Sequence, residues 1–119
     1  MAYWGSGPVD NDYAFDGIGA YIVLIKERMF KDASGVIEEA YPEQSIVASV
    51  QCLRLLAGQF PKCVRVSFRR KDFERAKAAF AQWYNAVQMK LPAEHREAIR
   101  LTAETEFQLF ESQVLSAPT

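Results

Sequence analysis

The acidic side chains near the N-terminus are the first candidates for chemistry. Asp10, Asp12 and Asp16 lie close together, and Asp12 and Asp16 are four residues apart, which places them on one face of a helix. Carboxylate oxygens in such a group are ligands that a divalent cation accepts. No second acidic segment accompanies them, however, and helix capping and solvent exposure explain all three more simply. We therefore expect no metal and no other cofactor.

His95 is the only histidine and the only obvious candidate for a general base. It lies between Glu94 and Glu97 just after Pro92, and no nucleophile can be named beside it. The sequence contains no Gly-x-Ser-x-Gly, no His-Glu-x-x-His and no phosphate-binding loop. We interpret His95 as a surface residue and the chain as a non-enzymatic protein without a small-molecule substrate.

A basic run is the strongest charge feature of the chain. Its seven bases are Lys62, Arg65, Arg69, Arg70, Lys71, Arg75 and Lys77. Phe68 and Phe73 alternate with them, as aromatic side chains do in proteins that bind nucleic acid. A surface rich in arginine also suits a protein partner, and a net charge of −1 makes nucleic acid unlikely as the main partner. A nucleic-acid-associated factor that uses residues 62–77 is the alternative function.

The number of cysteines and the length of the apolar runs indicate the cellular compartment in which the protein is expected. Cys52 and Cys63 are too few for a disulfide framework or a zinc site, and we interpret them as reduced packing residues of a cytoplasmic protein. The N-terminus lacks the basic and apolar regions of a signal peptide. The longest apolar run, residues 22–25, is too short to cross a bilayer, so no membrane association is expected.

Four segments repeat apolar residues at helical spacing. The first helix is expected over about residues 11–33 with Asp10 as its N-cap, and the close approach of another backbone or a local break would explain Gly17 and Gly19 inside it. The others are expected to begin at Pro42, Asp72 and Pro92 and to end near Gly58, Leu91 and Val114. The expected buried positions are Phe15, Ile18, Ile22, Ile25, Met29; Ile46, Val47, Val50, Leu53, Ala57, with Cys52 and Leu56 alongside; Phe73, Ala76, Phe80, Trp83, Val87; and Ile99, Ala103, Phe107, Phe110, Val114.

The apolar residues of segment 62–71 are expected to follow the spacing of a strand rather than that of a helix. Val64, Val66 and Phe68 alternate with polar residues, which is the period of a strand. Since a single strand has no partner, we expect an extended linker rather than a sheet. The prediction is an all-α fold, a compact and mostly antiparallel bundle of about four amphipathic helices, which forms one domain over residues 1–119.

The opening of the chain resembles a small bacterial family of unknown function. That family begins with Trp-Gly-x-Gly, then an Asn-Asp pair and Ala-x-Asp. The residues that carry the resemblance are Trp4, Gly5, Gly7, Asn11, Asp12, Ala14 and Asp16. Proteins of this kind look similar to the immunity proteins of polymorphic and contact-dependent growth-inhibition toxin systems. The resemblance therefore implies a cytoplasmic protein that forms a heterodimer with a cognate toxin.

The charge distribution predicts which residues would bind such a partner. Residues 1–60 carry eight acidic and four basic side chains, whereas residues 61–119 carry seven acidic and ten basic ones. An acidic surface would fit the basic cleft of a toxin that acts on nucleic acid and would speed association. The predicted partner-binding residues are Asp10, Asp12, Asp16, Glu38, Glu39, Glu43, Arg65, Arg69 and Arg70.

Overall fold

The computed structural model describes residues 12–33 and 44–116. Every regular element in these two ranges is helical, which confirms the all-α class. The described part of the chain contains five α-helices rather than four: α1 (Asp12–Ala33), α2 (Gln44–Gln59), α3 (Pro61–Ser67), α4 (Arg70–Val87) and α5 (Ala93–Phe110). A 3₁₀ turn, Gln88–Lys90, follows α4, and a π-helical turn, Glu111–Leu115, continues α5.

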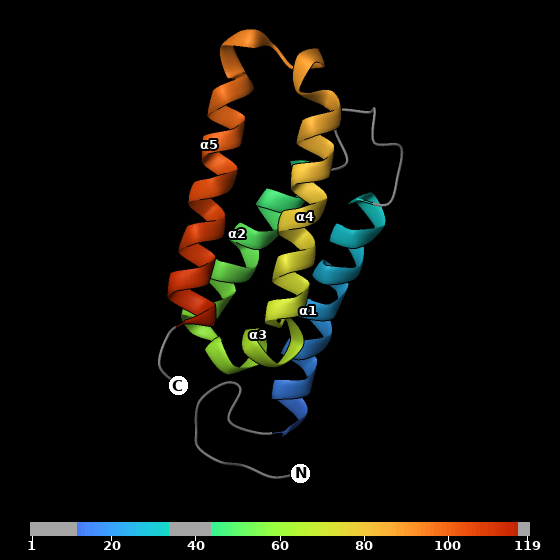
Figure 1. The fold of residues 1–119 in the computed structure, drawn as a ribbon. Helices are drawn as coiled ribbons and strands as arrows, with labels where there is room; N and C mark the ends of the chain where they lie inside the picture. The colour runs from blue at the N-terminus through green and yellow to red at the C-terminus, as the bar shows by residue number, and fades with distance from the viewer. Residues whose placement is uncertain (1–11, 34–43, 117–119) are drawn as a thin grey trace.

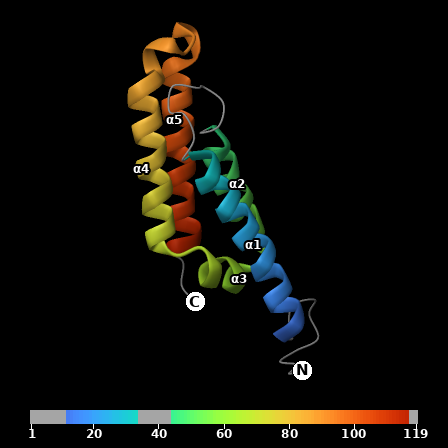
Figure 2. The same ribbon diagram turned by 90° about the vertical axis from the view of Figure 1, so that its right-hand side faces the viewer.

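The four long helices run alternately up and down, as Figure 1 shows. The molecule measures 53 × 26 × 21 Å, and the upper end of the α4–α5 hairpin projects beyond α1 and α2 (Figure 2). The predicted apolar stripes form its core: Ile22, Met29, Ile46, Val50, Leu53, Trp83, Val87 and Phe110 are among the side chains with the least exposure. Phe15, Ile18 and Ile25 are partly buried against this core.

Helix α3 contradicts the expected linker over residues 62–71. The buried residues of this segment are Cys63, Val64 and Phe68, and Phe60 is partly buried beside them. These positions repeat at steps of three and four, which is helical spacing, whereas Val66 is 52% exposed. Pro61 occupies the first turn, where its missing N–H breaks no helical hydrogen bond. The short helix thus turns the chain between α2 and α4.

The start of α4 also differs from the prediction. Arg69 is the N-cap, and Asp72, which was expected in that role, lies three residues further on. The Asp72 carboxylate accepts a hydrogen bond from the Arg69 backbone N–H at 3.0 Å. It also lies 3.5 Å from the Lys26 ammonium, which donates to the Ser67 carbonyl at 3.1 Å. Asp72 therefore still stabilises the helix start, and Lys26 ties α1 to the α3–α4 junction.

The two glycines inside α1, Gly17 and Gly19, have different surroundings. A Cβ at Gly19 would lie 3.3 Å from the Ser67 hydroxyl oxygen, so α3 does approach α1 closely at this point. At Gly17 no atom would lie within 4 Å of an added Cβ, so close approach does not explain that residue. The helix is continuous through both positions, and the alternative of a local break is wrong.

An aromatic layer joins α4 to α5. Phe73 stacks on Phe110 with ring centroids 5.3 Å apart, and Phe80 meets Phe107 edge-on at 6.0 Å. Above them, the Tyr84 hydroxyl donates to the Arg96 carbonyl at 3.1 Å. Aromatic rings in these geometries add to the energy of their burial, so this layer holds the two long helices together.

Candidate functional site: the groove between α2 and α5

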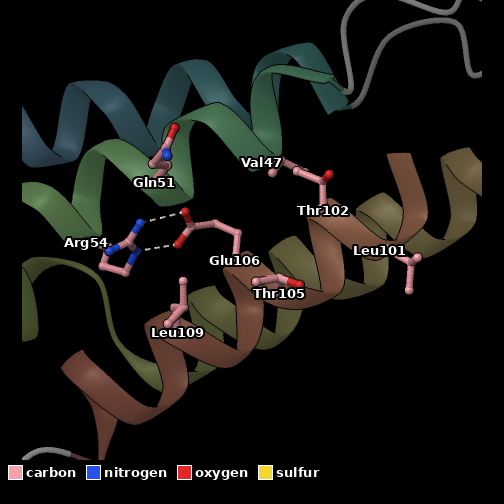
Figure 3. Close-up of a pocket in the computed structure, with 8 residues that line it drawn as sticks. All are labelled: Val47, Gln51, Arg54, Leu101, Thr102, Thr105, Glu106 and Leu109. Carbon is pink, nitrogen blue, oxygen red and sulfur yellow. Dashed lines mark hydrogen bonds and ion pairs between the residues drawn. The ribbon is translucent and has the colours of Figure 1, made fainter. Parts of the chain in front are cut away.

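A hollow of about 370 Å³ lies between α2 and α5. Figure 3 shows the eight side chains that line it, three from α2 and five from α5. They are Val47, Gln51, Arg54, Leu101, Thr102, Thr105, Glu106 and Leu109. We call this surface the α2–α5 groove. The two helices are adjacent and antiparallel, so side chains at the middle of each helix meet across it.

Arg54 and Glu106 point toward one another in the groove (Figure 3). The Arg54 Nε donates to Glu106 Oε2 at 2.6 Å, and its Nη2 donates to Oε1 at 3.0 Å. Their side chains are only 17% and 7% exposed. The Glu106 carboxylate raises the pKa of the Arg54 guanidinium above its usual range, mainly through this hydrogen bonding. The pair is bidentate, the geometry that favours arginine over lysine for a partly buried carboxylate.

The chemistry of the groove follows from this pairing. Because Arg54 and Glu106 neutralise each other, the side chains that remain for a ligand are uncharged. Leu101 is 48% exposed at the rim, and Gln51, Thr102 and Thr105 can donate or accept hydrogen bonds. The groove can therefore offer a ligand apolar contact and a few neutral hydrogen bonds.

Among the predicted acidic residues, only Asp16 has a side chain that the structure describes. Asp16 is exposed on α1. Asp12 begins α1, but its side chain lies outside the described part of the molecule. Asp10, Glu38, Glu39 and Glu43 lie outside it altogether. The acidic surface therefore stays a prediction.

The three arginines predicted to bind a partner lie within the described residues, and their surroundings differ. Arg65 is half-buried on α3, and Arg69 donates from Nε to the Val66 carbonyl at 3.2 Å. Arg70 forms two hydrogen bonds to Glu111, at 2.9 and 2.8 Å, and lies 3.8 Å from Glu74. Arg70 is thus engaged within the chain, and a partner would have to compete with Glu111 for it.

The basic segment also lacks the aromatic surface that the nucleic-acid interpretation invokes. Phe68 and Phe73 are 0% and 1% exposed. Both rings pack on Phe110, at 5.5 and 5.3 Å between centroids. They are core residues and cannot stack on bases, so this part of the interpretation is wrong.

The structure also shows the surroundings of the histidine, of Trp83 and of the two cysteines. His95 is exposed, as expected, and Trp83 is a core residue at 1% exposure. Cys63 is buried, which raises the pKa of its thiol, but Cys52 is exposed, so its interpretation as a packing residue is wrong.

Over residues 12–33 and 44–116, no three His, Cys, Asp or Glu side chains gather as a metal site. Within the same ranges, no helix is long and apolar enough to cross a membrane.

Comparison with protein-family models, with curated proteins and with solved structures finds nothing that matches this chain. Sequence reasoning missed the α2–α5 groove because its two charged residues are 52 positions apart. A signal was nevertheless present. Arg54 is the only charged residue of α2, and Glu106 lies among the apolar positions of α5, next to Phe107. A lone charge on each of two apolar helix faces indicates a buried pair.

Proposed function

We propose that this chain is a non-enzymatic protein-binding module that holds its partner in the α2–α5 groove. The observation that carries the proposal is a hollow without an unpaired charge: Leu101, one of the residues that line it, is 48% exposed, and Arg54 and Glu106 are hydrogen-bonded to each other. An uncharged hollow with an exposed leucine suits apolar contact with a side chain of a protein partner.

The narrower proposal is an immunity protein that binds and neutralises a cognate toxin domain in the cytoplasm. The support for this step is the resemblance carried by residues 4–16, together with the unequal charge of the two halves of the sequence. An inhibitor of this kind works by covering or distorting the partner's active site, so it needs a binding surface and no catalytic group of its own.

The experiment is co-expression with a toxin domain encoded beside the gene, followed by measurement of growth and of binding in solution. We expect protection and a one-to-one complex. Thr105→Arg places a charge in the groove and is expected to weaken binding at least about tenfold. Ala81→Arg, in a separate hollow between α4 and α5, is the matched control and is expected to leave binding unchanged. Protection without a stable complex would indicate an enzyme instead.

The electrostatic part of the proposal has its own test. Reversal of Asp12, Asp16 and Glu39 to Lys is expected to slow association if the partner's site is basic. Reversal of Arg65, Arg69 and Arg70 is the opposite test, and it also removes the Arg70–Glu111 pair. If neither reversal changes the association rate, apolar contact in the groove is the main source of affinity. Binding of RNA or DNA with a steep salt dependence, and no protein complex, would favour the nucleic-acid alternative.

A further inference from the structure

One long stretch of the chain carries positive charge and no negative charge. Residues 44–71, which span α2, α3 and the start of α4, contain six arginines and lysines and no aspartate or glutamate. The six are Arg54, Lys62, Arg65, Arg69, Arg70 and Lys71. Any carboxylate that neutralises these side chains must therefore come from another part of the chain.

Two carboxylates from the end of α5 neutralise part of this charge. Glu106 accepts hydrogen bonds from Arg54 at 2.6 and 3.0 Å, and Glu111 accepts them from Arg70 at 2.9 and 2.8 Å. Both pairs are bidentate, so they engage N–H groups that each arginine would otherwise offer to a partner. The positive charge that remains lies on α3 and at the start of α4.

The basic residues of α3 and of its C-terminal end stay unpaired. Among the residues that the structure describes, no aspartate or glutamate forms an ion pair with Lys62, Arg65 or Arg69. Arg69 donates from its Nε to the Val66 carbonyl at 3.2 Å. Asp72, the first acidic residue after the stretch, accepts a hydrogen bond from the Arg69 backbone and pairs with α1. An anionic partner would therefore meet three cations without a competing carboxylate from the described part of the chain.

These three cations lie around an exposed valine. The two buried residues of α3 face the core, and at about 100° per residue Lys62, Arg65 and Val66 lie on the opposite side of the helix. Val66 is 52% exposed. Lys62 lies one turn before it, and the Arg69 Nε lies at its carbonyl. Figure 2 shows α3 at the end of the bundle opposite the α4–α5 turn. We call Lys62, Arg65, Val66 and Arg69 the α3 face.

The composition of the α3 face indicates the class of its partner. An apolar centre within a polar rim is the arrangement found in protein–protein interfaces. A phosphate backbone offers no apolar group to Val66, and the buried Phe68 and Phe73 cannot stack on bases. Carboxylates, in contrast, pair with arginine in bidentate geometry. The partner that fits is a protein segment in which an apolar side chain lies between acidic ones.

We propose that the α3 face binds an acidic segment of a protein partner, whose carboxylates pair with Lys62, Arg65 and Arg69 around an apolar side chain on Val66. This interaction goes beyond the proposed use of the α2–α5 groove, because the groove and the α3 face share no residue. It depends on the chemistry of the segment and not on contact with the groove.

Fluorescence anisotropy of the full chain with a labelled synthetic peptide tests this proposal. The probe repeats Glu-Glu-Leu-Glu-Glu, and its control repeats Gln-Gln-Leu-Gln-Gln. At low salt we expect saturable binding of the acidic peptide with a dissociation constant below about 1 mM, and no binding of the neutral one. Equal binding of both peptides, or of neither, overturns the proposal.

Two double variants separate the α3 face from the net charge of the chain. Lys62→Gln/Arg65→Gln is expected to raise the dissociation constant at least about tenfold. Lys77→Gln/Lys90→Gln removes the same charge from exposed positions on and just after α4, and it should change the constant by less than about twofold. Equal weakening by the two would show that binding follows net charge, which refutes the proposal.

A single variant guards against a disturbed helix, because Arg65 is half-buried whereas Lys62 is exposed. Lys62→Glu should keep the circular dichroism of the wild type and raise the dissociation constant at least about threefold. An unchanged affinity in this variant would contradict a role of the α3 face.

The apolar centre has its own measurement. Replacement of the peptide's leucine by glycine should weaken binding to the wild type at least about threefold and leave binding to Val66→Ser unchanged. An equal loss for both proteins would refute contact of the leucine with Val66.

Two further results separate this proposal from its alternatives. A mixed-sequence RNA or a DNA duplex that binds more tightly than the acidic peptide would overturn it in favour of a phosphate-backbone contact. Thr105→Arg, which tests the α2–α5 groove, should bind the peptide as the wild type does, and Lys62→Gln/Arg65→Gln leaves the groove residues unchanged. The two proposals therefore fail separately.

Discussion

Arg54 on α2 and Glu106 on α5 meet through two hydrogen bonds, of 2.6 and 3.0 Å, although 52 positions separate them in the sequence. The pair connects two neighbouring helices of the bundle and leaves the α2–α5 groove without an unpaired charge. The Arg54 Nη1 also reaches Gln113 at 3.4 Å, beyond the end of α5. One guanidinium thus sets both the packing of α2 on α5 and the polarity of the surface between them.

A double-mutant cycle measures how much this pair contributes to folding. Arg54→Met leaves the Glu106 carboxylate nearly buried without its partner, and we expect a loss of about 3 kcal/mol in the free energy of unfolding. Glu106→Leu should cost a similar amount, because the Arg54 guanidinium then loses its partner. The double variant Arg54→Met/Glu106→Leu replaces both charges by apolar groups and should recover most of the loss, as measured by urea denaturation. Additive losses in the double variant would show that the two side chains act independently.

Replacement of Trp83 tests the centre of the core. Its side chain is 1% exposed and its ring lies 5.5 Å from that of Phe80. We expect Trp83→Ala to lower the free energy of unfolding by about 3–5 kcal/mol, because a large cavity remains. Met89→Ala, at a side chain 78% exposed, should change it by less than about 0.5 kcal/mol. Equal effects in thermal denaturation would contradict this division between core and surface.

The sequence predicts the long helices well and the short one badly. A long amphipathic helix repeats its apolar residues over several turns, so α1, α2, α4 and α5 are evident from spacing alone. Helix α3 has seven residues, and over so few positions Val64, Val66 and Phe68 fit a strand as well as a helix. The decisive signals were Pro61, which suits a first helical turn, and Phe60 and Cys63, which complete the helical spacing.

The candidate site was harder to predict than the fold. The sequence shows the charge of each side chain but not which oppositely charged side chain lies next to it. It therefore does not reveal that Glu111 binds the Arg70 guanidinium. The same limit applies to Phe68 and Phe73. Their position among basic residues indicated a stacking surface, but packing on Phe110 places both rings in the core. Tertiary contacts between distant residues decide both cases.

Arg70 and Glu111 provide a prediction about protonation. Arg70 lowers the pKa of the Glu111 carboxyl below its usual value of 4.5, mainly through hydrogen bonding. We expect Arg70→Met to raise this pKa toward 4.5, as measured by NMR titration of the side-chain carboxyl. Glu97, whose pKa is lowered by Arg100 instead, is the internal control and should not move.

The sign of the effect on stability follows from the same shift. A carboxyl with a lower pKa in the folded chain binds fewer protons there than in the unfolded chain. Glu111 therefore stabilises the fold above its unfolded pKa, and this contribution is lost as the pH falls from about 4.5 through its folded pKa. The difference in stability between wild type and Arg70→Met should accordingly shrink below pH 4.5. A difference that grows toward acid pH would rule out this ion pair as its source.

Two glycines of α1 should respond differently to the same substitution. Neither has a positive φ, so alanine is compatible with the backbone at both positions. Gly17→Ala meets no atom within 4 Å and should raise the free energy of unfolding by about 0.5–1 kcal/mol through helix propensity. Gly19→Ala places a Cβ 3.3 Å from the Ser67 hydroxyl oxygen, so part of that gain should be lost to crowding between α1 and α3. In a Ser67→Ala background the hydroxyl is absent, and Gly19→Ala should then stabilise as much as Gly17→Ala. Urea denaturation of the four variants measures this, and an unchanged deficit at Gly19 without the hydroxyl would show that Ser67 is not its cause.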